Sequence, residues 1–410
     1  MVHFDKYWLT LYPFTYFKTK KNKTIIYNTL TGEYEIFNTN NDVIKINKRL
    51  SSKKNIGTIN LNLKHYNKSN IKKFITKIRS LYAGDLIPKF KNKKPVQITP
   101  YLKVQAEIVK KQTKNDYTNP FANELESHLN EIIIHLNESN DFFTNENYIS
   151  LQTDYIIPRN HNSKDNQFSI DELAKVMSLS GKKFRIVGDL KNYTNKDKFF
   201  SIINKSINKT YFHTRINDIT LSDINIFKDR KIILQWNDIY KYWDSVNIKK
   251  LKNNKVLKTQ FFVQSLDDYK YIKSQINKEK IQRYSIFPYF NGKNYDFFYN
   301  NISLTKEEIL NNKQKMIDIQ IKQELNLNYY GRLSIKSNGD IYSNLNKSKV
   351  GNYFETSISE CISFELDNKH GWKHTRKYIK PCNQCIYQYL CPSLSNYEYV
   401  MRKPNLCQVL

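Results

Sequence analysis

The sequence is poor in glycine, with only 10 in 410 residues, and their positions exclude several common motifs. No G-x-G-x-x-G or G-x4-G-K stretch occurs, so neither a Rossmann nucleotide turn nor a Walker loop is expected. The motifs H-E-x-x-H and G-x-S-x-G are also absent. The sequence therefore has none of these local signatures of nucleotide-dependent or hydrolytic enzymes.

Long apolar runs are missing as well. The most apolar segments, such as Ile132–Leu136, have the length of a strand, whereas a membrane span needs about 20 apolar residues. The N-terminus M-V-H-F-D-K-Y-W lacks the basic region and apolar run of a secretory signal. We therefore expect a soluble, cytoplasmic protein with no membrane partner, in a compartment that keeps thiols reduced and able to bind metal.

Acidic residues are scarce beside basic ones, which leaves a net charge of +28. One interpretation is a protein that binds nucleic acid through phosphate contacts. The other is compositional drift in an AT-rich genome, which enriches Lys, Asn, Ile, Tyr and Phe. The lysines are spread along the whole chain and mixed with Asp and Glu, so the pattern favours drift.

Cysteine is absent before Cys361, and four of the five cysteines lie in the tail. Cys382, Cys385, Cys391 and Cys407 form a C-x2-C-x5-C-x15-C array. Thiolates grouped in this way hold zinc or an iron–sulfur cluster. An odd cysteine count without a secretory signal argues against a disulfide framework. One tight pair followed by two single ligands differs from the paired knuckles of a zinc ribbon, so the spacing favours iron–sulfur, with zinc as the alternative.

Residues 1–88 have the pattern of a small α+β domain. Aromatic and β-branched runs predict a hairpin, a turn at Gly32 predicts a third strand, and two amphipathic patterns predict helices. We expect Ser69 to cap the second helix. The predicted strands are Phe14–Thr19, Thr24–Asn28 and Glu33–Phe37, and the predicted helices are Asp42–Leu50 and Asn70–Tyr82.

Residues 89–330 open with a basic linker, Lys89–Gln97, and then alternate between strand and helix patterns. Such alternation predicts β-α units with a parallel sheet, closed as a barrel or open as a partial barrel. Capping signals lie at Ser169 and Thr305. The predicted strands are Glu131–Leu136, Ile149–Gln152, Phe184–Val187, Thr210–Arg215, Ile232–Trp236, Thr259–Val263 and Tyr284–Pro288. The predicted helices are Ser169–Met177, Lys196–Ser206, Asp268–Asn277 and Thr305–Asn312.

Few polar residues in this region suggest catalysis. Three acids, Asp154, Asp189 and Asp218, follow strands but have no evident His or Lys partner, so we expect capping or solvated roles. His135 and His213 lie within apolar strands and are expected to be core histidines. The pair His370 and His374 precedes the cysteines in the basic segment G-W-K-H-T-R-K, which we expect to be exposed. Because four cysteines already complete a closed site, neither histidine is assigned to it.

The tail G-W-K-H-T-R-K-Y-I-K-P-C-N-Q-C-I-Y-Q-Y-L-C-P-S-L-S-N-Y-E resembles the C-terminal part of a SPASM domain. That domain follows the partial barrel of radical SAM enzymes that modify ribosomal peptides, and its full form binds two auxiliary [4Fe–4S] clusters. The resemblance implies a SPASM-like iron–sulfur domain at 331–410. It also implies that Cys382, Cys385, Cys391 and Cys407 hold the second cluster.

The ligands of the first auxiliary cluster are missing together. The glycine turn of the family matches at Gly339, but Asn344 and Ser395 occupy cysteine positions of the family pattern. No cysteine lies in Gln323–Tyr329, where the earliest ligand belongs. The resemblance therefore implies a single [4Fe–4S] cluster, and the loss of one whole ligand set further favours iron–sulfur over zinc.

The catalytic loop of radical SAM enzymes is also missing. They use C-x3-C-x2-C after the first barrel strand to hold the cluster that binds and cleaves S-adenosylmethionine (SAM), whereas this chain has N-E-S-N-D-F-F-T-N-E-N. We therefore expect no catalytic residues and no SAM cofactor. Along most of its length the chain resembles the pseudo-radical-SAM/SPASM proteins of Bacteroidales peptide-maturation systems. Phrases such as Y-N-T-L-T-G-E, L-Q-T-D-Y-I-I-P and P-Y-F-N-G-K-N-Y-D-F-F carry this resemblance.

Residues 1–88 resemble a PqqD-like element, which binds a leader peptide as an added strand beside a helix. Together these resemblances imply an accessory protein of ribosomal-peptide maturation, with a precursor peptide and a true radical SAM enzyme as partners. Cys361 has no ligand counterpart and is expected to pack as a small hydrophobic residue. The alternative hypothesis is a basic nucleic-acid-binding protein with a structural four-cysteine zinc site.

Overall fold

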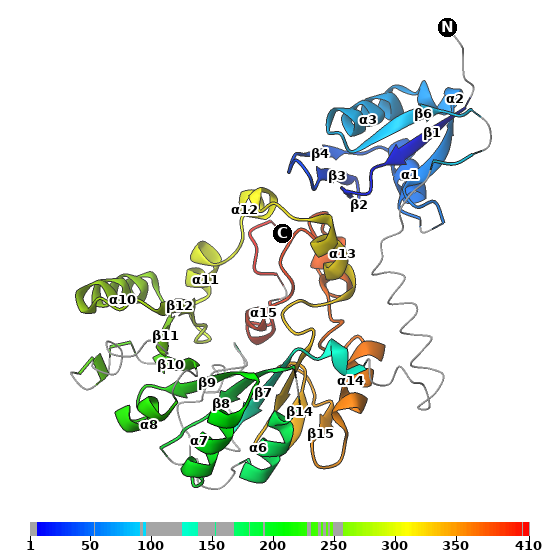
Figure 1. Ribbon diagram of the computed structural model, residues 1–410. Helices are drawn as coiled ribbons and strands as arrows, with labels where there is room; N and C mark the ends of the chain where they lie inside the picture. The colour runs from blue at the N-terminus through cyan, green and yellow to red at the C-terminus, as the bar shows by residue number, and fades with distance from the viewer. Residues whose placement is uncertain are drawn as a thin grey trace.

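Three sheets organise the described residues of the chain in the computed structural model. The residues that the structure describes are 6–52, 54–90, 93–95, 125–137, 152, 168–179, 181–191, 193–227, 231–236, 239–240, 243–244, 247–248, 257–403 and 405–409. Two small antiparallel sheets belong to the N-terminal region, and one large sheet belongs to the remainder of the chain. Figure 1 shows the N-terminal region at the upper right, with the C-terminal segment between it and the large sheet.

The N-terminal region combines two three-stranded sheets with three helices. One sheet has the order β5-β1-β6, and the other is the meander β2-β3-β4. The strands are β1 (Lys6–Leu11), β2 (Thr15–Lys20), β3 (Lys23–Asn28), β4 (Tyr34–Asn38), β5 (Thr58–Asn62) and β6 (Gly84–Pro88). The helices are α1 (Asn41–Leu50), α2 (Leu63–Tyr66) and α3 (Ser69–Ser80).

The meander and the two longer helices confirm the local predictions for this region. The predicted cap of α3 is wrong: Ser69 is already helical, and Lys68 precedes it without a side-chain capping bond. The apolar stripe of α3 is nevertheless buried, with Phe74 and Ile78 among its members. The sheet β5-β1-β6 was not predicted, because its strands are far apart in sequence and pair only when the chain folds.

The large sheet has the order β12-β11-β10-β9-β8-β7-β13-β14-β15. Strands β12 to β7 and β13 run parallel, and only β14 and β15 are antiparallel. The prediction of an α/β fold with a mostly parallel sheet is therefore confirmed. Its strands are β7 (Glu131–His135), β8 (Lys183–Val187), β9 (Lys209–Arg215), β10 (Lys231–Trp236), β11 (Leu257–Val263), β12 (Tyr284–Pro288), β13 (Arg332–Ile335), β14 (Asp340–Tyr342) and β15 (Gly351–Asn352).

Strand β13 pairs with β7, so the C-terminal part of the chain continues the same sheet. The strand predicted at Ile149–Gln152 lies outside the described residues except for Gln152. The helices that follow the strands are α6 (Ile170–Met177), α7 (Lys196–Lys205), α8 (Leu221–Ile226), α10 (Leu266–Glu279), α11 (Tyr295–Asn301), α12 (Lys306–Asn311), α13 (Met316–Glu324), α14 (Ile358–Asp367) and α15 (Asn396–Val400). None of the described helices is long and apolar enough to span a membrane.

Capping was predicted correctly at α12 but not at α6. Thr305 and Glu308 form a reciprocal capping box at the start of α12. Ser169 precedes α6 but makes no side-chain capping bond. A serine or threonine at the capping position therefore accepts a backbone N–H of the first turn only when its backbone conformation and rotamer allow it.

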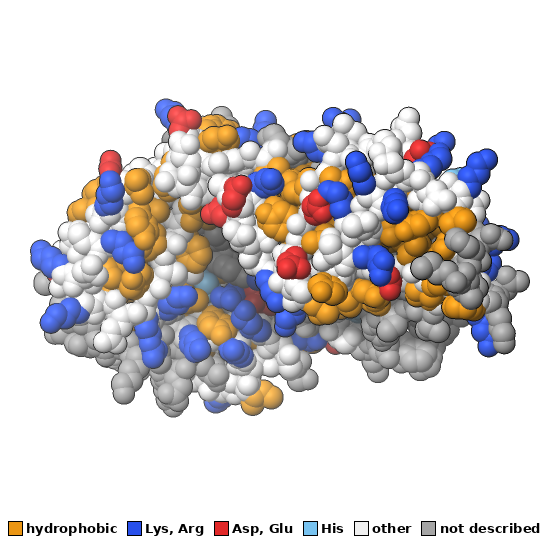
Figure 2. All heavy atoms as spheres, turned by 90° about the horizontal axis from the view of Figure 1, so that it is seen from above, with side chains coloured by type: hydrophobic (Ala, Val, Ile, Leu, Met, Phe, Trp, Pro, Cys, Tyr) orange, Lys and Arg blue, Asp and Glu red, His pale blue; other side chains and the backbone are white. Residues whose placement is uncertain are grey.

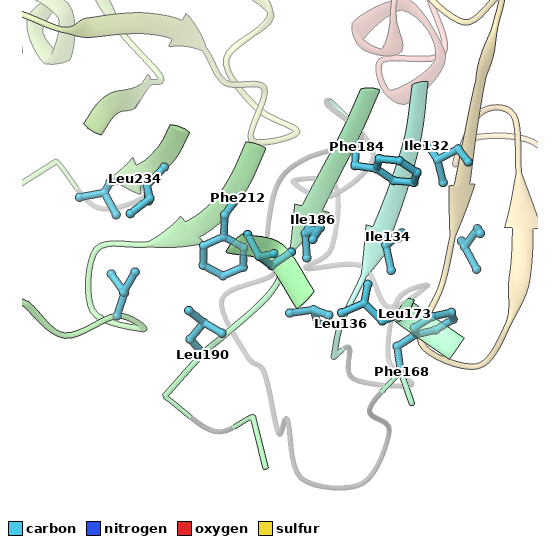
Figure 3. Packing of buried hydrophobic residues seen from close by; sticks show 14 of the residues in the cluster. Ile132, Ile134, Leu136, Phe168, Leu173, Phe184, Ile186, Leu190, Phe212 and Leu234 are labelled. Carbon is cyan, nitrogen blue, oxygen red and sulfur yellow. The ribbon is translucent and has the colours of Figure 1, made fainter. Parts of the chain in front are cut away.

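One face of the large sheet carries the main hydrophobic core. Alternate residues of each strand point to this face, including Ile132, Ile134, Phe184, Ile186 and Phe212, all at most 1% exposed. Figure 3 shows these side chains meeting Leu136, Phe168, Leu173 and Leu190, and helices α6 and α7 lie along the sheet in Figure 1. Burial of such a continuous apolar face provides most of the driving force for this fold.

Asp189 and Asp218 are buried, which corrects the solvated alternative expected for them, whereas the bond of Asp189 to a backbone N–H fits the capping alternative. Asp189 is 2% exposed, and its Oδ1 accepts a bond of 2.8 Å from the Lys191 N–H. Asp218 is 8% exposed and pairs with Arg215. Asp154 lies outside the described residues. His135 and His213 are core histidines as predicted, at 2% and 0% exposed.

Candidate metal centre

Three of the four tail cysteines are positioned by local backbone bonds. Cys382 begins a 3-10 turn, η3 (Cys382–Gln384), and its carbonyl accepts the Cys385 N–H at 3.0 Å. The Cys391 N–H donates to the Tyr387 carbonyl at 3.1 Å. These short-range bonds explain why the C-x2-C-x5-C spacing is sufficient to gather three sulfurs.

The fourth cysteine is brought in by a long-range contact. Cys407 forms an isolated parallel bridge with Leu304, in the loop before α12. The Leu304 N–H donates to the Leu406 carbonyl at 3.1 Å, and the Gln408 N–H donates to the Leu304 carbonyl at 2.9 Å. The tail is therefore fixed against the α11–α12 connection with Cys407 turned toward the other cysteines.

All four cysteines line one hollow, here called the cysteine hollow, together with Leu304, Arg376, Gln388 and Leu406. It contains about 320 Å³ of space not occupied by atoms, including a part open to solvent. Within the described residues, no group of three or more His, Cys, Asp or Glu side chains is placed to hold a single metal ion. The sulfurs thus surround a shared space without converging on one point, and their assignment as ligands stays a prediction.

Burial makes the hollow unfavourable for unpaired thiolates. It raises the pKa of Cys385 to about 11 and that of Cys391 to about 12, and it also raises the pKa of Cys382. Arg376 opposes this effect, because its Nη1 donates to the Cys382 sulfur at 3.4 Å. A bound metal would supply the positive charge that stabilises the other thiolates, since coordination deprotonates a thiol outright.

Arg376 is itself buried and held by Glu398. The Arg376 Nη1 lies 2.8 Å from Glu398 Oε1, and the two side chains are 10% and 3% exposed. Burial opposes the charged form of Arg376, but Glu398 and the nearby thiols raise its pKa above the ordinary value. The expectation that G-W-K-H-T-R-K is an exposed segment is therefore wrong at Arg376, which tertiary contacts place inside the site.

Neither member of this ion pair was expected from the sequence. Glu398 is fixed by a capping box at the start of α15, in which the Ser395 N–H donates to its Oε2 at 2.8 Å. The pattern S-N-Y-E, a serine with a glutamate three residues later, was the signal that could have identified this helix start. Ser395, which occupies a cysteine position of the resembled family, serves here as a helix cap.

A polar network surrounds Asn344, which occupies another of those cysteine positions. Asn344 is fully buried, and its Oδ1 accepts the Asn346 N–H at 2.7 Å. Asn346 in turn donates to Asn396 Oδ1 at 2.9 Å, and Tyr329 donates to the same oxygen at 2.8 Å. The preceding turn depends on Gly339, whose φ of +85° is a conformation that few other residues adopt.

The two histidines near the tail face away from the hollow. His370 Nδ1 lies 2.5 Å from the buried Glu365, and His374 Nδ1 lies 2.5 Å from the Tyr399 hydroxyl. Neither lines the cysteine hollow. Cys361 is fully buried in the main hydrophobic core, in agreement with a packing role.

The N-terminal region packs directly on the cysteine segment. The Tyr16 hydroxyl donates to the Ile386 carbonyl at 2.8 Å, between Cys385 and Cys391. Lys18 Nζ lies 4.8 Å from the centre of the Tyr389 ring, and the Gln314 N–H donates to the Tyr27 hydroxyl at 3.3 Å. Strands β2 and β3 therefore share a hydrophobic cluster with the residues between the cysteines.

A second hollow lies where the N-terminal region meets α12. Its walls are the turn before β4, the end of α3 and the end of α12, and it contains about 1050 Å³ of unoccupied space, including open solvent. The lining includes Thr31, Glu33, Tyr34, Ser80 and Lys313. This groove is larger and more open than the cysteine hollow and is suited to an extended chain rather than an ion.

Comparisons with known proteins identify no family for this chain. No protein-family model and no curated protein matches it. Among solved structures, it is similar to SuiB of Streptococcus suis bound to precursor peptide SuiA, with a TM-score of 0.45 and 14% identity over 98% of this chain and 100% of that chain. SuiB alone gives a TM-score of 0.46 and 13% identity over the same shares. SuiB bound to S-adenosylmethionine gives 0.43 and 14% over 93% and 94%.

Proposed function

We propose that this chain is a catalytically degenerate, radical SAM/SPASM-like accessory protein of ribosomal-peptide maturation. It holds one [4Fe–4S] cluster on Cys382, Cys385, Cys391 and Cys407, and it binds a precursor peptide, a radical SAM partner or both. One observation carries the proposal: four cysteines spread over the tail line a single hollow, and no cysteine precedes Cys361.

The residues of the hollow fit an iron–sulfur cluster. All four donors are thiols, which is the usual ligand set of such clusters. Four thiols could also bind zinc, so the measured iron and zinc contents distinguish the two metals.

A cluster with four protein ligands has no open iron, so it would act as a structural crosslink or as a carrier of one electron. The chain's own residues set its surroundings. Arg376 donates to the Cys382 sulfur, and such bonds tune the reduction potential of a cluster. Leu304 and Leu406 cover part of the hollow with apolar surface and limit the access of water.

The polar network around Asn344 and Asn396 supports the loss of the other cluster. Where the resembled family has cysteines, this chain has a buried asparagine and a helix cap; Asn344 Oδ1 accepts a hydrogen bond, whereas its Nδ2 has no partner among the described residues. Rebuilding of this region as a packed protein interior is consistent with a chain that works with one cluster.

Peptide recognition is assigned to the groove beside β4. Within the described residues, β4 is the outer strand of its sheet and pairs only with β3. An extended leader peptide can add a strand to this edge, with its side chains against α3 and the end of α12. Because β2 and β3 pack on the residues between the cysteines, peptide bound here would lie close to the cluster segment.

The test is anaerobic purification of the full chain, followed by measurement of iron, sulfide, zinc and the electron paramagnetic resonance spectrum. We expect about four irons and four sulfides per chain. Cys391→Ser should lose most of the iron, whereas Cys361→Ala, the matched cysteine control outside the hollow, should retain it. Incubation with SAM and dithionite should release no 5′-deoxyadenosine.

Release of 5′-deoxyadenosine by this chain alone would disprove the catalytic loss. A colourless, zinc-loaded protein that binds DNA or RNA in a salt-dependent manner would instead support the alternative function.

A further inference from the structure

The face of the large sheet opposite the main core changes along its strands: Ile133, Val187 and Ile233 are buried on it, whereas its amino end carries cations. Parallel strands are normally apolar on both faces, because helices cover both. Here the face opposite the main core carries Lys183 and Arg185 on β8, Lys209 on β9 and Lys231 on β10.

These cations converge on one aromatic ring, that of Tyr211. Arg185 Cζ lies 4.9 Å from the ring centre, and the Nζ atoms of Lys183, Lys231 and Lys209 lie at 5.4, 5.7 and 5.8 Å. The strand register produces the cluster, since Lys183 pairs with Lys209, Arg185 with Tyr211, and Tyr211 with Lys231. We call Lys183, Arg185, Lys209, Tyr211 and Lys231 the basic rim.

The cluster contains far more positive than negative charge. Glu131, on the next strand, pairs with Lys183 and lies 3.0 Å from Arg185 Nε and 3.4 Å from Arg332 Nε. No carboxylate of the described residues lies within 4.0 Å of Lys209 or Lys231, and both side chains are exposed. One tyrosine ring stabilises a nearby cation by about 0.5–1 kcal/mol at an exposed site, which does not offset the mutual repulsion of four cations.

The neighbouring His213 does not add to this positive charge, and its lowered pKa reflects the cations beside it. His213 follows Tyr211 on the same face, and its Nε2 lies 2.9 Å from Arg185 Nη1. Burial, together with the charges of Arg185 and Lys183, lowers its pKa well below the ordinary value. His213 is therefore neutral and accepts the bond from Arg185, which holds the guanidinium in the rim.

The location sets this cluster apart from the usual binding end of a parallel sheet. Lys183, Lys209 and Lys231 are each the first residue of their strand, so the basic rim lies at the amino ends of β8, β9 and β10. Ligands of parallel α/β sheets normally bind at the carboxyl ends. Figure 2 shows lysine and arginine side chains gathered beside a hollow of the surface.

We propose that the basic rim binds a carboxylate-rich, extended peptide segment, namely an acidic stretch of the precursor. This inference rests on the proposed function for the origin of the peptide. Three adjacent strands about 4.8 Å apart spread the cations over about 10 Å, a distance that an extended chain crosses in about three residues at about 3.3 Å each. Single-stranded nucleic acid needs open aromatic faces for base stacking, whereas cations surround the Tyr211 ring.

The experiment measures binding of a fluorescent peptide of alternating glutamate and serine to the cluster-loaded full chain, at about 0.1 M salt. The same peptide with glutamine in place of glutamate is the neutral probe. We expect the acidic probe to bind at least about tenfold more tightly than the neutral one, and K209E/K231E to lose about tenfold or more of that affinity. The control K278E/K293E makes the same change in net charge at exposed sites and should lose less than about threefold.

Three outcomes would overturn the proposal. An equal loss in both double variants would mean that the probe senses net charge alone. Equal affinity for the glutamate and glutamine probes would exclude carboxylate recognition. Tighter binding of an oligothymidine of similar length, competing with the acidic probe, would make the rim a nucleic-acid site. Iron content is measured on the same samples, so failure of the rim is distinguishable from failure of the cluster assignment.

Discussion

The cysteine hollow and the basic rim differ in how far their charged side chains are balanced by opposite charges. In the hollow, the buried Arg376 is paired with the buried Glu398 and also contacts a sulfur. At the rim, four cations surround one ring beside a single paired carboxylate of the described residues. Charged side chains that are paired within the protein suit a site for a permanently bound group. A surplus of one charge suits a site that binds a ligand reversibly.

The largest effect should come from breaking the pair in the hollow. Glu398→Ala leaves the buried Arg376 without its carboxylate and removes the cap of α15, so we expect a loss of about 3–5 kcal/mol in the free energy of unfolding. Anaerobic denaturant titration measures it. The double variant R376M/E398L should recover part of the loss, and a single variant as stable as the parent chain would show that the pair is not buried in solution.

A pH effect should follow next, from His374. Burial lowers its pKa to about 4, with Lys347 and His370 adding to the shift. Protonation is therefore disfavoured in the folded state, so stability should fall as pH drops from about 6.5 towards 4 and level off below that. After allowance for the solvent that reaches the ring, we expect about 1–2 kcal/mol.

The matched variant His374→Gln should lack this component, and the measurement is the difference between the two unfolding curves at pH 7 and pH 5. If both proteins lose the same stability between these pH values, the pH dependence belongs to other groups.

The contact between the N-terminal region and the cysteine segment should contribute less to the free energy of unfolding than the groups above. Tyr16→Phe removes the hydroxyl that donates to the Ile386 carbonyl, and we expect a loss of about 1 kcal/mol. Hydrogen exchange of the residues between Cys385 and Cys391 should rise in this variant. Tyr12→Phe, on the same region but without a bond to that segment, serves as the control, and equal exchange in both would argue against coupling.

The smallest effect should have the opposite sign and occurs at the basic rim. Lys209→Glu replaces a repelled cation with a carboxylate near Lys183, so the free protein should gain up to about 1 kcal/mol in stability while it binds the acidic probe more weakly. Thermal unfolding with and without probe measures both quantities. A loss of stability would show that the rim cations are not in mutual repulsion.

Much of the fold was predictable because its signals are local. Strand alternation predicted β7 to β12. In the N-terminal region, the hairpin and turn signals predicted the meander, and the amphipathic patterns predicted α1 and α3. The sheet β5-β1-β6 was missed because β1, β5 and β6 gain their stability only from pairing over long sequence separations. The burial of Asp189 and Asp218 was missed although their side-chain partners, the Lys191 N–H and Arg215, are near in sequence, because burial depends on how distant segments pack around them.

The sequence by itself determined which donors this protein has: four thiols in the tail with three at short spacing, and none for a SAM-binding cluster. Tertiary structure alone decided that Cys407 joins them through its bridge to Leu304, that Arg376 and Glu398 are buried beside them, and that cations of three strands meet at Tyr211. The physical reason is that spacing controls contacts over a few residues. Strand register and packing control which distant charges are brought together and how much water remains between them.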